Sequence, residues 1–94
     1  MIVGVLRIEL VVYESHSLKD KRSVIKGLKS RLAERFNVSI AEVGALDSRQ
    51  QAVLGVAVVG SDTAFVHSNL DKVIDFVRRQ GRASLVKYER ELYY

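Results

Sequence analysis

The charged chemistry of this chain is concentrated in one short segment, residues 18–36. Seven lysine and arginine side chains fall there against two carboxylates, so the segment carries a net charge of +5 while the whole chain carries +4. Clustered ammonium and guanidinium groups attract phosphates, and a basic stripe on a small domain is the usual electrostatic footprint of nucleic-acid binding. The residues predicted to bind RNA phosphates or another anion are Ser17, Lys19, Lys21, Arg22, Lys26 and Lys29.

The start of this segment carries cations where a helix favours acids. Ser17 is a good N-cap residue, and Asp20 stands three positions later, as in a capping box. A helix N-terminus is partially positive, yet Lys19, Lys21 and Arg22 occupy the first turn. An anion there would be held by free backbone N–H groups, by the helix dipole and by the cations together. The alternative is that these long side chains extend into solvent and bind nothing.

The two histidines form no recognisable catalytic or metal-binding motif. His16 and His67 fall in different predicted elements, neither has a second histidine at helical spacing, and the chain has no cysteine. We therefore expect a non-enzymatic protein without a metal or a cofactor. Glu42 stands in an otherwise apolar strand. It either faces a basic partner or lies in water at the edge of the sheet, and the second placement is favoured.

Hydrophobic periodicity predicts the elements that position these residues. Alternation with a period of two indicates strands, and apolar residues at helical spacing indicate two helices. In the last strand Val86, Tyr88 and Leu92 are expected on one face, with charged residues on the other. The predicted order begins with a strand over 2–13 and a helix over 18–36, which Asn37 ends and can cap in the left-handed conformation. A strand that alternates over 38–43 and ends near Leu46, a strand over 52–59, a helix between Asp62 and Gly81 and a strand over 83–92 follow.

This order of elements is that of a ferredoxin-like α+β fold, βαββαβ. We expect a single domain over residues 1–94, with a four-stranded antiparallel sheet, the first and third strands at its centre, and both helices on one face. By its helical angle Lys21 falls among the apolar residues, and we expect its long side chain to reach past the edge of the core. The predicted core is Leu6, Ile8, Leu10, Ile25, Leu28, Leu32, Leu54, Val56, Leu70, Val73 and Ile74.

Three blocks of sequence resemble a known family. They are S-L-K-D-K-R at Ser17–Arg22, F-N-V-S-I-A-E-V at Phe36–Val43 and A-V-L-G-V-A at Ala52–Ala57. These blocks resemble the YlxP-like family of bacterial domains of unknown function. The resemblance implies a small ferredoxin-like protein with no assigned catalytic activity, encoded near translation initiation and ribosome maturation factors, and hence association with RNA or the ribosome. Family members often carry an aromatic residue in the turn where this chain has Arg49, so base stacking is not expected at that turn.

Two functional hypotheses of different classes follow. The third strand has no aromatic residue and the first offers only Tyr13 at its end, so the sheet lacks the stacking residues of an RNA-recognition motif. In the first hypothesis the basic helix binds structured RNA or the ribosome through phosphates. The alternative is a dimeric regulatory or assembly module that binds a small anion at the N-terminus of that helix.

The first strand also predicts self-association. Val3, Val5 and Val11 lie on the side of that strand opposite its core residues, and an exposed apolar surface favours burial by a partner. We expect a homodimer. We also expect a cytoplasmic protein that makes no membrane contact, because no stretch of the sequence is long and apolar enough to cross a bilayer.

Overall fold

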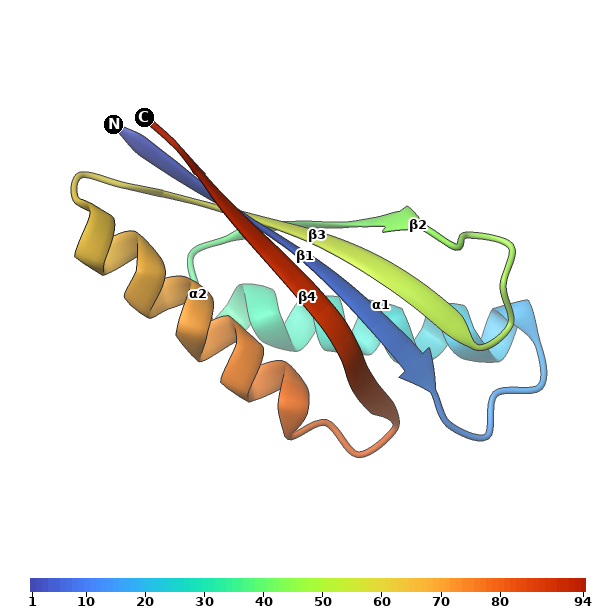
Figure 1. Ribbon diagram of the computed structural model, residues 1–94. Coiled ribbons are helices and arrows are strands. Elements are labelled where there is room, and N and C mark those ends of the chain that lie inside the picture. The colour runs from blue at the N-terminus through green and yellow to red at the C-terminus, as the bar shows by residue number, and fades with distance from the viewer.

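The computed structural model describes residues 1–94, the whole of the sequence. The elements in chain order are β1 (Ile2–Val12), α1 (Leu18–Arg35), β2 (Ser39–Gly44), β3 (Gln51–Gly60), α2 (Thr63–Arg78) and β4 (Ala83–Tyr93). The strands form one antiparallel sheet in the order β2-β3-β1-β4, and both helices cover the same face of it (Figure 1). The predicted ferredoxin-like α+β fold is confirmed, with the first and third strands at the centre. Neither helix combines the length and hydropathy that a bilayer crossing requires.

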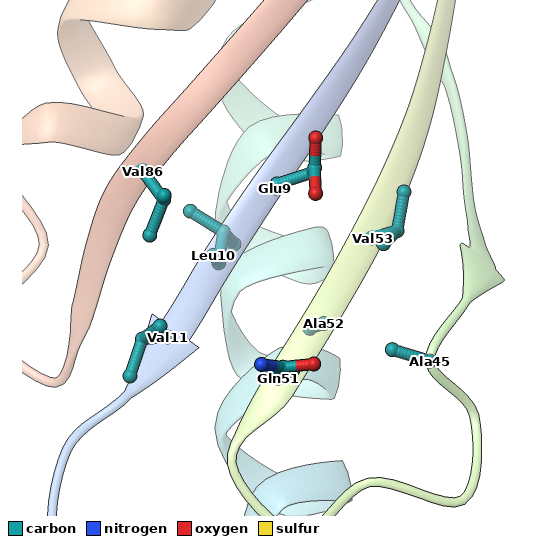
Figure 2. A pocket seen from close by; sticks show the side chains of 8 residues that line it. All are labelled: Glu9, Leu10, Val11, Ala45, Gln51, Ala52, Val53 and Val86. Atoms are coloured by element: carbon teal, nitrogen blue, oxygen red, sulfur yellow. The ribbon is translucent and has the colours of Figure 1, made fainter.

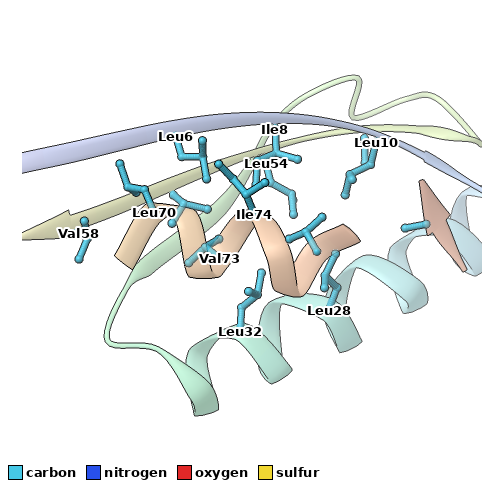
Figure 3. Close-up of a cluster of buried hydrophobic side chains, with 14 of the residues drawn as sticks. Leu6, Ile8, Leu10, Leu28, Leu32, Leu54, Val58, Leu70, Val73 and Ile74 are labelled. Atoms are coloured by element: carbon cyan, nitrogen blue, oxygen red, sulfur yellow. The ribbon is translucent and has the colours of Figure 1, made fainter. Parts of the chain in front are cut away.

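The two faces of the sheet differ because successive side chains of a strand point in opposite directions. On β1, Leu6, Ile8 and Leu10 are buried toward the helices, while Arg7 and Glu9 point the other way. We call the side away from the helices the outer face. Between the sheet and the helices, leucine, isoleucine and valine side chains from β1, β3, α1 and α2 form one core (Figure 3). All eleven residues of the predicted core are buried, with 3% exposure or less.

The end of α1 differs from the prediction. Phe36 is the C-cap, with extended backbone angles of φ −130° and ψ 146°, and its N–H donates to the carbonyl oxygen of Leu32. The residues other than glycine with positive φ are Glu14 and Ala45, so the prediction of a left-handed Asn37 is wrong. The ring of Phe36 packs edge to face on that of Phe76 in α2, with the centroids 5.9 Å apart. The chain therefore leaves α1 in an extended conformation that places an aromatic ring on the second helix.

A bulge in β4 changes which residues face solvent. Glu9 of β1 lies opposite Lys87, but the next residue, Leu10, lies opposite Leu85. Val86 is the extra residue and is 64% exposed. It lines a hollow of the outer face together with Glu9, whereas the predicted alternation places it with Tyr88 on the other face. That prediction is wrong at Val86, because a bulge sets two residues of one strand against one of its neighbour and breaks the period of two.

Candidate nucleic-acid interface

Helix α1 begins at the predicted N-cap. The Oγ of Ser17 accepts a hydrogen bond from the backbone N–H of Asp20 at 3.0 Å. The carboxylate of Asp20 pairs in turn with the guanidinium of Arg82, which precedes β4, at 3.2 Å. The hydroxyl oxygen of Ser17 is therefore used in starting the helix, and its contact with an anion stays a prediction. Because Arg82 compensates the acid of the first turn, the charge of this end comes from Lys19 and Arg22.

Lys21 lies in the interior of the protein. Its side chain is fully buried, and Nζ donates to Oε2 of Glu42 at 2.9 Å. Nζ also donates to the backbone carbonyl oxygens of Ala45 at 3.0 Å and Gln51 at 3.1 Å. An ammonium group has three N–H donors, so none remains for an external anion. The prediction that Lys21 belongs to the anion-binding set does not hold in the structure, and neither does the expectation that it reaches past the core edge, because the β2–β3 hairpin supplies acceptors inside.

The register of β2 brings Glu42 to this position. Glu42 is paired with Leu54, whose side chain is buried in the core, so both side chains point to the helix side of the sheet. The side chain of Glu42 is 15% exposed. The favoured placement in water at the sheet edge is therefore wrong. Glu42 does face a basic group, but that group comes from the same chain and fastens the hairpin to the start of α1.

Four cations remain on one side of α1, and we call them the basic stripe. Three of them are exposed and the last is half-buried, beside a shallow groove between α1 and the edge strand β2. None of the four takes part in an ion pair within the chain. The stripe is therefore positive charge without an intramolecular partner. Its members are Lys19, Arg22, Lys26 and Lys29.

Many of the other cations are occupied by partners. On the side of α1 that faces α2, Arg31 donates to the amide oxygen of Gln80 at 2.9 and 3.2 Å. Arg35 lies over the ring of Phe76, with the guanidinium carbon 5.6 Å from the ring centroid. The two sides of α1 thus differ in that one side uses its cations to hold α2 and the other leaves them free. Elsewhere, carboxylates pair with Arg7, Lys21, Arg82, Lys87 and Arg90.

The remaining titratable groups lie outside the stripe. His16 is exposed in the turn before α1. Nδ1 of His67 is 3.0 Å from Nη1 of Arg90, which also pairs with a carboxylate of α2, so His67 belongs to the contact between α2 and β4. On β4 the hydroxyl of Tyr93 donates to the carboxylate of Glu91, and this hydrogen bond and the negative charge raise the pKa of Tyr93. No group of three or more potential metal ligands is formed.

The central strands provide no aromatic platform. Neither β1 nor β3 contains a phenylalanine, tyrosine or tryptophan. Tyr13 follows β1 in the turn and is half-exposed. RNA-recognition motifs stack bases on aromatic side chains of their sheet. The two central strands therefore lack the residues for that mode of recognition, as the sequence predicts; the exposed aromatic residue of the outer face, Tyr93, lies on the edge strand β4.

The chain matches known proteins over most of its length. Residues 3–90 fit the family model described as "Protein of unknown function (DUF503)". The chain is also 36% identical over 75 residues to the "Uncharacterized protein YlxP" of Bacillus subtilis (strain 168). The aligned region covers 80% of this chain and 82% of YlxP. The chain belongs to the DUF503 family. The predicted YlxP-like resemblance is thereby confirmed, and neither description states an activity. The DUF503 match runs from β1 into β4, so it includes the basic stripe and both members of the Lys21–Glu42 pair.

The pairing of Lys21 with Glu42 was not predicted from this DUF503 sequence. The three acceptors lie 21, 24 and 30 residues beyond Lys21 in the chain, too far for any local pattern. A signal was nevertheless present. Lys21 stood alone at an apolar angle of a helix, and Glu42 stood alone in an apolar strand. Two isolated residues of opposite charge that both point into the core are candidates for an ion pair with each other, because a buried charge needs a partner.

Proposed function

We propose that this DUF503 protein binds the phosphate groups of structured RNA, such as that of the ribosome, through the basic stripe, and that it does so in the cytoplasm without catalysing a reaction. The observation that carries the proposal is the contrast between the two sides of α1. Arg35 contacts Phe76 of α2 and Arg31 contacts Gln80 just after α2, whereas the stripe has no ion pair within the chain. Unpaired cations gathered on one surface attract a polyanion.

The spacing of the stripe suits a phosphate backbone. Its members recur at intervals of three and four residues, which places them along one side of a helix. The ten residue-to-residue steps from Lys19 to Lys29 rise by about 15 Å, enough to face several consecutive phosphates. Each contact with an exposed cation is screened by salt and individually weak. The affinity must therefore come from the sum of the contacts, and it should fall steeply with ionic strength.

The surroundings of the stripe favour phosphate contact over base recognition. No aromatic residue occurs in α1, and none occurs in the neighbouring strand β2. Proteins that grip single strands rely on aromatic side chains for stacking, whereas phosphate contacts position RNA without reading its sequence. We infer recognition of the shape and charge of folded RNA, with little preference for sequence.

Fluorescence anisotropy of a labelled RNA hairpin over a series of KCl concentrations tests this function. Each phosphate contact contributes a slope of about −0.7 to −0.9 to the plot of log K against log salt, so four contacts give about −3. Changing Lys19, Arg22 and Lys26 together to Gln should reduce the slope to about −1. Binding should weaken alike for RNAs of different sequence, because the stripe reads no bases.

The matched control removes the same charge from α2 and its C-cap. Replacing Lys72, Arg78 and Arg79 by Gln should leave the salt slope unchanged, and thermal melts of both variants should verify their folding. The proposal fails if the stripe variant binds RNA like the parent, or if the parent binds without salt dependence. Stoichiometric binding of inorganic phosphate without retention of RNA would instead support a regulatory or assembly module with an anion site at the start of α1.

A further inference from the structure

The outer face of the sheet is an uncovered surface of mixed character. Both helices lie on the opposite side, so nothing in the chain shields it (Figure 1). Much of it is apolar, and Val59 remains 59% exposed. An antiparallel sheet can leave one face in water, but exposed apolar side chains on such a face favour burial by a partner. The apolar side chains that the two central strands direct to this face are Val3, Val5, Val11, Val53, Ala57 and Val59, of which Val53 is only 7% exposed.

Four charges on this face form a square of alternating sign. Arg7 pairs with Glu9 two residues along β1 at 3.1 Å, and Lys87 pairs with Glu89 two residues along β4 at 3.2 Å. The strand register sets Arg7 beside Glu89 and Glu9 beside Lys87. Every member therefore has an opposite charge next to it both along its strand and across to the neighbouring strand. We call these four residues the charge square. Their side chains are 37% to 60% exposed.

A square of this pattern is complementary to itself. Consider two copies stacked face to face and related by a twofold axis that lies in the interface and runs perpendicular to the strands. The cross-strand pair Arg7 and Glu89 of one copy then lies over the cross-strand pair Glu9 and Lys87 of the other. Arg7 of each copy then faces Glu9 of the other, and Lys87 faces Glu89. A twofold interface uses the same patch on both subunits, so it requires such self-complementarity. A different protein would only need a surface complementary to this face, and the face would not need to be complementary to its own copy.

We propose that a second copy of this chain docks on the outer face, with the charge square at the centre of the interface. The same axis stacks β1 on β1 and β3 on β3, so the valines of the central strands are buried with the charges. Sheets stacked in this way keep their strands within about 30° of each other and lie about 10 Å apart. The paired charges set the register of the two copies, and the apolar side chains supply the burial.

The size of the face fits this occupant. The molecule measures 42 by 21 by 18 Å, and the sheet extends along its long dimension. A face bounded by the two larger dimensions is of the same order as the ~800 Å² per partner of a standard stable interface. The hollow beside Glu9, Val53 and Val86 holds only about 100 Å³ (Figure 2). Sites for small molecules usually hold roughly 300 to 1,000 Å³, so the face suits another protein surface better than a small ligand.

This interface is independent of the proposed RNA contact. The basic stripe lies on α1, on the other side of the sheet, so a dimer joined through the outer faces leaves both stripes open to solvent (Figure 1). The two stripes would lie on opposite outer sides of the dimer. Failure of the RNA proposal would leave the dimer untouched, and failure of the dimer would leave each stripe as it is.

Sedimentation equilibrium on nuclease-treated protein at high micromolar concentration tests the dimer. The parent should sediment as a dimer. Replacing Arg7 and Lys87 together by Glu makes all four corners of the square acidic, and opposed like charges should raise the dissociation constant by about 100-fold or more. Changing Lys72 and Arg79 to Glu alters the net charge equally on the helix side, and this control should remain dimeric.

A fourfold variant separates the interface from misfolding. Arg7→Glu, Glu9→Arg, Lys87→Glu and Glu89→Lys together invert every sign and restore the alternating pattern, so this variant should recover the dimer. Far-UV circular dichroism should show the parent fold in the acidic double variant. The proposal is overturned if the parent is a monomer, which would leave the face to a different protein. It is also overturned if the double variant dimerises like the parent, or if the inverted square does not restore the dimer.

Discussion

At the scale of single residues, Lys21 performs a structural task that its charge alone would not suggest. Removing an ammonium group from water costs several kcal/mol, and only a charge partner with additional hydrogen bonds offsets this. Here one carboxylate and two carbonyl oxygens take all three N–H donors. No buried side-chain nitrogen or oxygen in the structure lacks a hydrogen-bond partner. The group is therefore satisfied where it lies and positions the β2–β3 hairpin against α1.

Replacing Lys21 by Met should lower the free energy of unfolding by about 3–5 kcal/mol, because the largely buried carboxylate of Glu42 loses its partner. Urea unfolding monitored by circular dichroism measures the change. The matched control is Lys26→Met on the exposed side of the same helix, which should change stability by about 0.5 kcal/mol or less. Equal effects of the two substitutions would contradict the structural role of Lys21.

Substitution of the partner residue, Glu42, tests the same ion pair in a second way. In the double variant Lys21→Met with Glu42→Leu, no uncompensated charge remains, so we expect part of the loss to be recovered. Recovery should be incomplete, because the carbonyl oxygens of Ala45 and Gln51 still lack the donor that Lys21 supplied. Losses in the two single variants that simply add in the double variant would show that Lys21 and Glu42 are not coupled.

At the scale of elements, two glycines have opposite effects on stability, because one permits close packing and the other does not. Gly4 lies on β1 under α2, where an added Cβ would overlap Cγ1 of Val66 and stand 3.1 Å from Cδ1 of Leu70. Gly27 lies in the middle of α1, where an added Cβ would meet only the end of the flexible Arg31 side chain, at 3.2 Å. The first glycine permits a close approach of strand and helix. The second only weakens the helix.

Alanine at these two positions should therefore act in opposite directions. Gly4→Ala should destabilise the protein by about 1–3 kcal/mol, the usual range for overpacking a core. Gly27→Ala should stabilise it by up to about 1 kcal/mol, because alanine favours the helix more than glycine does. Thermal or urea unfolding of the two variants measures both effects. A stabilising Gly4→Ala would show that β1 and α2 are not packed as closely as described.

At the scale of the whole molecule, the sheet separates two surfaces with different proposed tasks. The helix side carries the basic stripe, and the outer face carries the charge square. Since the core lies between the stripe and the sheet, changes on one surface should not reach the other. Substitutions more than about 7–10 Å apart without shared partners usually have independent effects.

This separation gives a further expected outcome. The stripe variant of Lys19, Arg22 and Lys26 should keep the dimer of the parent in sedimentation equilibrium. The acidic double variant at Arg7 and Lys87 should keep the salt slope of RNA binding, measured by anisotropy. Its net charge is lower by four, so its absolute affinity should fall somewhat through long-range repulsion. A dimer lost in the stripe variant would contradict the assignment of separate surfaces.

Features decided by neighbouring residues could be read from the sequence itself. The alternation of β1, the apolar spacing of both helices and the N-cap at Ser17 predict the elements, because each depends on residues within a few positions. The order of the elements then predicts the ferredoxin-like sheet. The basic stripe was also visible in the sequence, since helical spacing alone gathers its members on one side.

Other features depended on contacts between distant segments, and only the tertiary structure decided them. Lys21 differs from the stripe cations through acceptors on β2, on β3 and in the turn between them, which no local sequence pattern indicates. Val86 turns outward because β1 and β4 shift their register at a bulge. The charge square exists only because this same register sets Arg7 beside Glu89. Burial and strand register arise from the packing of the whole chain, so they fix which charges face water and which charges face each other.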